Sequence, residues 1–183
     1  MRTNHTAFLI LACAGILSTP QSVHAEAPDA PAAQVRSSNT RIREALAYAV
    51  GRSSLLEGLI ATLNQLDRVV YVEEGRCPHR EQRSCLQLMP TPGGKYLFVR
   101  IDSRQPDRAV VAQLAHELYH AVEIARAPGV VDAASFTVLY DRIGTRICGE
   151  QTDACWETEA AVAFAASVTR QLSGPLVATG GSR

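Results

Sequence analysis

One segment of this 183-residue chain, residues 106–126, constrains the fold more than any other. Its apolar residues recur at the spacing of an amphipathic helix. Pro106 and Asp107 favour a helix start, and Pro128 favours a stop shortly after residue 126. A helix of this length with an apolar face must pack against a core, so we expect it to lie at the centre of the domain.

The helix carries the motif H-E-x-x-H, in which His116 and His120 flank Glu117. Histidines four residues apart on a helix point the same way and can share one metal ion. The glutamate between them can serve as general base toward a water that the metal activates. Such a pentapeptide also arises by chance, as two unrelated surface histidines. The amphipathic helix and the strand-like residues 95–102 before it favour the metal site.

The spacing of apolar residues in the rest of the chain predicts a mixed α/β (α+β) domain. We expect a minimal zincin-like unit that is mostly helical, with a small sheet next to the motif helix. Alternating β-branched and aromatic residues predict strands, and apolar residues three and four apart predict helices. The expected helices cover 40–66, broken at 51–53, 106–126, 132–144 and 155–172, and the expected strands cover 69–72, 85–89 and 95–102.

The N-terminus predicts a secretory signal rather than a part of the fold. Arg2 precedes the apolar run 7–17, and Ala25 ends a small-x-small cleavage site. An uncleaved anchor and a lipoprotein modified at Cys13 are the weaker alternatives. The predicted organisation is a signal peptide over 1–25, a disordered leader over 26–39, a domain over 40–172 and a flexible tail over 173–183. The protein is therefore expected to be secreted or periplasmic.

Cleavage removes Cys13 and leaves four cysteines, an even number typical of disulfides in an exported chain. We expect the pairs Cys77–Cys85 and Cys148–Cys155, because each closes a short local loop. The alternative is a metal cluster of Cys77, His79 and Cys85, whose spacing matches no common zinc motif.

A catalytic zinc needs a third protein ligand. A glycine at position 123 and a histidine at position 126 would indicate a metzincin, but the chain has Glu123 and Arg126 there. Glu123 instead suits a role in the second shell, accepting a hydrogen bond from a ligand imidazole. A solvated acid paired with Arg126 or Arg108 is the alternative. The candidates for the third ligand are His79, Glu123, Glu150, Glu157 and Glu159.

The chain resembles the gluzincins, in which H-E-x-x-H is followed by an acidic ligand on a later helix, often within E-x-x-A. The matching residues here are Glu157-Thr-Glu-Ala160, so the resemblance implies Glu157 as third ligand, with Glu159 as the alternative. Over about residues 40–170 the runs LAHELYHAVEIARAPGVVDAASF, LYDRIG and WETEAA also resemble a group of small exported bacterial proteins, which implies no substrate.

These observations predict an exported zinc metallopeptidase that hydrolyses peptide bonds in a peptide or protein substrate. The strand over 95–102 is expected to form the wall of the cleft. Tyr140, Tyr119 and Arg142 are candidates for stabilising the oxyanion. A non-catalytic zinc-binding module and a zinc amidase acting on a non-peptide cell-wall bond are the alternatives.

The charge and hydropathy of the chain argue against nucleic acid and membranes as partners. Eighteen basic and eighteen acidic side chains leave no net charge, and no basic cluster suggests nucleic acid. No span of the mature chain is long and apolar enough to cross a membrane. The sequence does not predict substrate specificity, oligomeric state or latency.

Overall fold

The computed structural model describes residues 33–79, 81–89, 91–148 and 155–173. The predicted signal peptide, the leader up to residue 32 and the predicted tail except Ser173 lie outside the described residues, and Ser173 is the last residue of a helix. Within the described part, no helix is long and apolar enough to serve as a membrane span. The description below concerns the domain that begins at Ala33.

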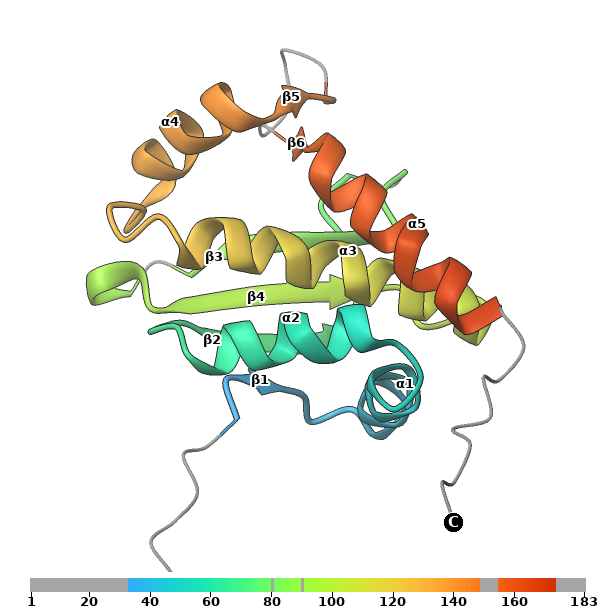
Figure 1. Ribbon diagram of the computed structural model, residues 1–183. Coiled ribbons are helices and arrows are strands. Elements are labelled where there is room, and N and C mark those ends of the chain that lie inside the picture. Colours follow the sequence, from blue (N-terminus) through green and yellow to red (C-terminus); the bar gives the residue numbers. More distant parts are fainter. Residues whose placement is uncertain (1–32, 80, 90, 149–154, 174–183) are drawn as a thin grey trace, which may run out of the picture. The chain divides into compact units, whose positions relative to one another are not determined.

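The domain has a mixed α+β fold, as predicted, with five α-helices and a small mixed sheet (Figure 1). The strands of the main sheet lie in the order β1-β2-β4-β3. β1 is parallel to β2 and β2 to β4, whereas β3 is antiparallel to β4. The bounds of these strands are Val35–Arg36 for β1, Val69–Glu74 for β2, Ser84–Leu88 for β3 and Tyr96–Ile101 for β4.

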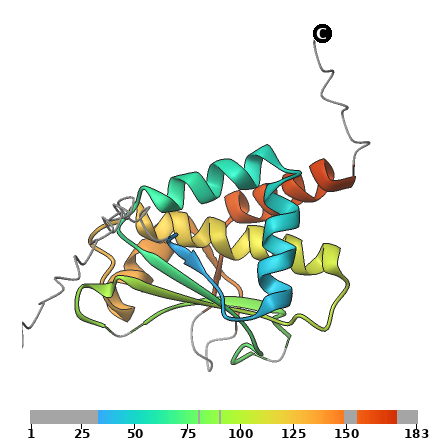
Figure 2. The same ribbon diagram turned by 90° about the horizontal axis from the view of Figure 1, so that it is seen from below.

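The helices α1, α2, α3 and α5 gather on one face of the sheet (Figure 2). Leu97, Val99 and Ile101 alternate along β4 and are fully buried toward this face. Because α3 packs against the sheet, α2 and α5, it is buried on several sides and can carry polar groups into the interior. The bounds of the helices are Thr40–Val50 for α1, Ser54–Asn64 for α2, Asp107–Ala125 for α3, Ala133–Ile143 for α4 and Glu159–Ser173 for α5.

Local signals set the helix ends as the sequence predicted. The break between α1 and α2 is followed by Ser53, whose hydroxyl accepts a hydrogen bond from the Leu56 amide and caps α2. Asp132 caps α4 by accepting from the Ser135 amide, in a reciprocal capping box with the Ser135 hydroxyl. Gly144 follows the last residue of α4.

Two predictions about the chain ends need correction. The disordered leader expected over 26–39 does not extend to its described residues, because Val35 and Arg36 form β1 against β2. The last helix begins at Glu159 rather than at residue 155, and Trp156–Glu157 forms strand β6. β6 pairs antiparallel with β5, Thr145–Arg146, as a small two-stranded sheet.

Arg68 holds together the turn before β4 and the connection between α3 and α4. Its buried guanidinium donates to the carbonyl oxygens of Gly94 and Val130, the second at 2.7 Å. Gly94 has a φ of +57°, and a Cβ there would lie 2.7 Å from the Val131 Cα. Only glycine can adopt this positive φ and lie this close to Val131 without a shift of the backbone.

Candidate metal centre and cleft

Three ligand-type side chains converge from α3 and β6. His116 and His120 lie one turn apart on α3, with their Nε2 atoms 3.2 Å from each other. Glu157 on β6 completes the group, with Oε2 3.2 Å from His116 Nε2 and Oε1 3.4 Å from His120 Nε2. These ligand atoms could hold one metal ion.

The separations suit a tetrahedral ion closely. A tetrahedral site with metal–ligand bonds of about 2.05 Å places its ligand atoms about 3.4 Å from one another. The separation of the two nitrogens, 3.2 Å, is close to this value, and so is the distance from each nitrogen to the nearer oxygen of Glu157, 3.2 and 3.4 Å. The donor set of two imidazoles and one carboxylate also suits a divalent transition metal.

The hairpin of β5 and β6 brings Glu157 to α3. Thr145 of β5 is paired with Glu157, and the disulfide Cys148–Cys155 closes the connection between the two strands. Gly144 lets the end of α4 approach the backbone of Glu157, because a Cβ at position 144 would lie 2.9 Å from the Glu157 carbonyl oxygen. Glu159, the alternative ligand, is exposed in the first turn of α5 and is not part of the group.

Glu123 lies behind the ligands and contacts three side chains, those of His120, Tyr140 and Thr158. Its Oε2 is 2.7 Å from His120 Nδ1 and accepts a hydrogen bond from the Tyr140 hydroxyl at 3.3 Å. Its Oε1 accepts from the Thr158 hydroxyl at 2.8 Å. The Thr158 amide in turn donates to Glu157 Oε1 at 2.8 Å. Glu123 thus lies where it can accept a hydrogen bond from a ligand imidazole, and it connects that imidazole to the segment that carries the carboxylate.

The charges of the metal-free group reflect these contacts. Burial opposes protonation of His120, but its hydrogen bonds with Glu123 and Glu157 outweigh it and raise the pKa to about 9. Burial also opposes ionisation of Glu157, yet His116 and His120 lower its pKa to about 2. The carboxylate and the imidazoles therefore stabilise each other's charged forms.

Glu117 is buried next to the ligand group, with 4% of its surface exposed. Burial raises the pKa of its carboxyl group, while His116 and a hydrogen bond with Ser84 act in the opposite direction. Ser84 is the first residue of β3, so this contact joins the motif helix to the edge of the sheet. A carboxyl group in such a setting can accept and return a proton.

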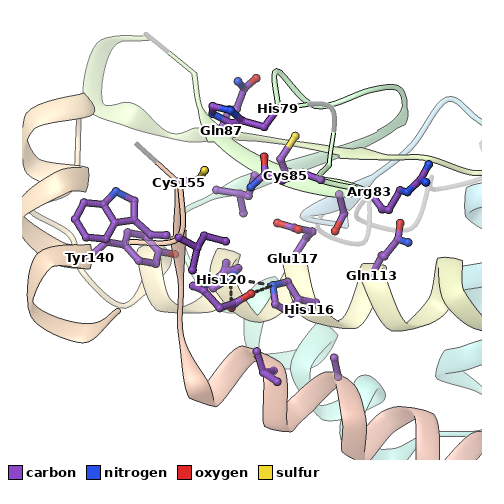
Figure 3. Close-up of a pocket in the computed structure, with 18 of the residues that line it drawn as sticks. His79, Arg83, Cys85, Gln87, Gln113, His116, Glu117, His120, Tyr140 and Cys155 are labelled. Atoms are coloured by element: carbon purple, nitrogen blue, oxygen red, sulfur yellow. Dashed lines mark hydrogen bonds and ion pairs between the residues drawn. The ribbon is translucent and has the colours of Figure 1, made fainter. Parts of the chain in front are cut away.

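A cleft opens over the ligand group, and β3 forms its wall. The prediction that residues 95–102 form this wall is wrong, because β4 lies between β2 and β3 and both its edges are paired. β3 is the edge strand, and Ser84 to Gln87 line the cleft. Figure 3 shows Glu117, His116 and His120 below this strand.

The register shows which backbone groups of β3 face outward. The Met89 amide donates to Tyr96, and the Arg83 carbonyl accepts from Asp102, so odd-numbered residues bond to β4. The amides and carbonyls of Ser84, Leu86 and Leu88 therefore point away from the sheet. They offer an extended chain an edge on which to pair.

Of the three candidates for stabilising an oxyanion, Tyr140 alone is among the described residues that line the cleft. Its hydroxyl donates to Glu123 and its ring lies against that of His120, with the centroids 5.7 Å apart. Tyr119 instead packs its ring against Phe164, on the side of α5. The cleft is also lined by Arg83 and Gln113, which no sequence motif indicated.

Both predicted disulfides are present, Cys77–Cys85 and Cys148–Cys155, as suits a secreted protein. The first one rules out Cys77 and Cys85 as a metal cluster with His79 while they remain oxidised. His79 lies near the second disulfide rather than with His116 and His120, so it does not supply the third ligand of that group. Glu150 lies outside the described residues.

No protein-family model, curated protein or solved structure matches this chain.

Proposed function

We propose that this chain is an exported zinc metallopeptidase of minimal gluzincin type. The convergence of two imidazole nitrogens and the Glu157 carboxylate within 3.2–3.4 Å of one another, beside the buried Glu117, supports this most directly. His116, His120 and Glu157 would hold the ion. Two imidazoles and a carboxylate leave the fourth position of a zinc ion open, as in catalytic rather than structural sites.

When bound, zinc would supply a Lewis acid that lowers the pKa of a water molecule and polarises a carbonyl oxygen. Glu117 accepts the proton of the attacking water and returns it to the amine nitrogen as the C–N bond breaks. The outward amides and carbonyls of Ser84, Leu86 and Leu88 hold the substrate as an added strand, which keeps a peptide bond beside Glu117. Glu123 fixes the orientation of His120.

The test combines metal analysis with cleavage of a broad peptide library by the full exported chain. We expect about one zinc per molecule in the wild type and in Glu117→Gln, with cleavage reduced about 10²–10⁴-fold in that variant. Glu157→Gln should lose zinc and activity together. Glu159→Gln is the matched control, because Glu159 is exposed two residues away, and it should keep both.

The other outcomes discriminate between the rival functions. Wild type that binds zinc and cleaves no peptide would favour the non-catalytic module, or an amidase if cell-wall fragments are hydrolysed. Wild type without zinc under metal-replete conditions would overturn the proposal.

A further inference from the structure

The two ends of the cleft differ in chemical character. Arg83 and Gln113 lie on one side of Glu117 and Tyr140 on the other, with the ligand histidines between them (Figure 3). All of these side chains line the same cleft. A substrate that spans the cleft must therefore meet a polar, cationic end and an aromatic end at once.

At the cationic end, Arg83 shares its carboxylate partner with Arg104, a residue that Glu74 also attracts. Arg83 donates to Asp102 Oδ2 at 3.1 Å, but the same carboxylate also binds Arg104 through both of its oxygens. One carboxylate thus faces two guanidinium groups. The Arg83 side chain is 61% exposed, so its remaining N–H groups are accessible to solvent where the residue lines the cleft. A planar guanidinium is suited to bind a carboxylate with two hydrogen bonds.

Gln113 supplies a second polar group at this end. Among the described residues, no hydrogen-bond donor reaches its buried Oε1 atom. A buried acceptor without a donor costs free energy. Gln113 also lines the cleft, so its amide adds a polar group to this end.

The opposite end is apolar. Phe136 and Tyr140 pack ring to ring with centroids 4.6 Å apart, and both line the cleft. Tyr140 is itself buried, so the accessible apolar surface at this end is that of the half-buried Phe136. Ile147 and Val162 are exposed by 54% and 49% and also line the cleft. An aromatic or aliphatic side chain that contacts these residues would remove their surface from water.

From this polarity we propose that the cleft selects extended peptides with a carboxylate at the Arg83 end and a large apolar side chain at the Tyr140 end. Arg83 is the specificity-determining residue. The carboxylate can come from an Asp or Glu side chain or from a free C-terminus. Arg83 directly precedes β3, so a strand added antiparallel to β3 would bring its C-terminal part to this end. The proposal rests on the peptidase assignment for its substrate class.

The test measures binding separately from turnover. Fluorescent peptides are titrated by polarisation into the zinc-loaded Glu117→Gln protein, with Glu against Gln at each position and with free against amidated C-termini. We expect an acidic peptide to bind about twofold to fivefold more tightly than its neutral partner. This preference should disappear in Arg83→Gln. The preference should persist in Arg104→Gln. This variant also removes a cation that binds Asp102, but Arg104 is not among the described residues that line the cleft.

The two series of peptides identify the source of the carboxylate. A preference in the Glu series indicates a side chain, and one in the free-terminus series indicates the C-terminus. Equal binding of all pairs, or a preference that survives in Arg83→Gln, would overturn the proposal. If the preference is found and wild type cleaves none of these peptides, the peptidase assignment fails while the selection by Arg83 stands.

Discussion

The hydroxyl of Thr158 donates a hydrogen bond to Oε1 of Glu123, 2.8 Å away. This bond connects the segment that carries Glu157 to the helix that carries His116 and His120. Thr158 follows Glu157 directly, and Glu123 contacts His120. The same hydroxyl accepts from the Ala161 amide and caps α5. One buried side chain therefore fixes the start of a helix and the spacing of two ligands.

Thr158→Val should lower zinc affinity about 10–100-fold, the range typical for loss of an outer-shell partner. Thr158→Ser keeps the hydroxyl and should retain most of the affinity. Competition with a chromophoric chelator well below the unfolding temperature gives the affinity of the folded protein. Melting of the metal-free variants reports the lost helix cap separately. Equal zinc affinity in the Val and Ser variants would show that the Glu123 contact does not position Glu157.

Loss of the Cys148–Cys155 disulfide should weaken zinc binding, because that bond closes the hairpin that carries Glu157. The Cys148→Ala/Cys155→Ala variant is compared with Cys77→Ala/Cys85→Ala, which opens the loop before β3. Isothermal titration with zinc should show a larger loss of affinity in the first variant. Identical affinities in the two would mean that the hairpin holds its shape without the bond.

Gly94→Ala should destabilise the domain by about 2 kcal/mol or more, because it adds backbone strain to a clash with Val131. Gly58→Ala is the matched control. Gly58 lies in α2 with open space around its Cα, so alanine there should stabilise by about 0.5–1 kcal/mol. Urea unfolding gives both values. Similar midpoints for the two variants would contradict the close approach at Gly94.

Asp102 should make the domain sensitive to acid. Hydrogen bonds from Arg104 and Arg83 hold the pKa of its buried carboxyl group well below the ordinary value of 3.8. Folding therefore favours the ionised form, and this stabilisation is full above about pH 4 and is lost as the pH falls further. Asp102→Asn should be less stable than wild type at pH 7 and closer to it at pH 2.

Thermal unfolding between pH 2 and pH 7 measures this convergence. Asp67→Asn is the control. Asp67 forms an ion pair with Lys95 at 2.8 Å, but 84% of its side chain is accessible, and so exposed a pair contributes little, so its melting curves should follow those of wild type. A constant difference between Asp102→Asn and wild type at all pH values would show that Asp102 stabilises the fold by some means other than its charge.

Much of the fold follows from local patterns. The periodicity of residues 106–126 predicted α3, and the cysteine spacing predicted both disulfides. The order of the strands did not follow, because pairing joins residues distant in sequence. Residues 85–89 and 95–102 both have strand character, and only the tertiary structure shows that the first is the edge.

The site was likewise predicted only where its residues lie close together in the sequence. His116, Glu117 and His120 form a local motif, whereas Glu157 was expected on a helix and lies on β6. Thr158 before Glu159 is a typical N-cap and would have indicated the later helix start. Arg83 and Gln113 carry no such signal, since α3 and the edge of the sheet bring them to the cleft.

The outward amides and carbonyls of β3 also affect how the protein behaves when it is concentrated. A free edge accepts any extended backbone, including that of a second molecule, and such edges template aggregation. β3 is five residues long, with Arg83 directly before it. A short strand flanked by a charge resists self-pairing, so the edge can stay open for a ligand while the protein remains dispersed.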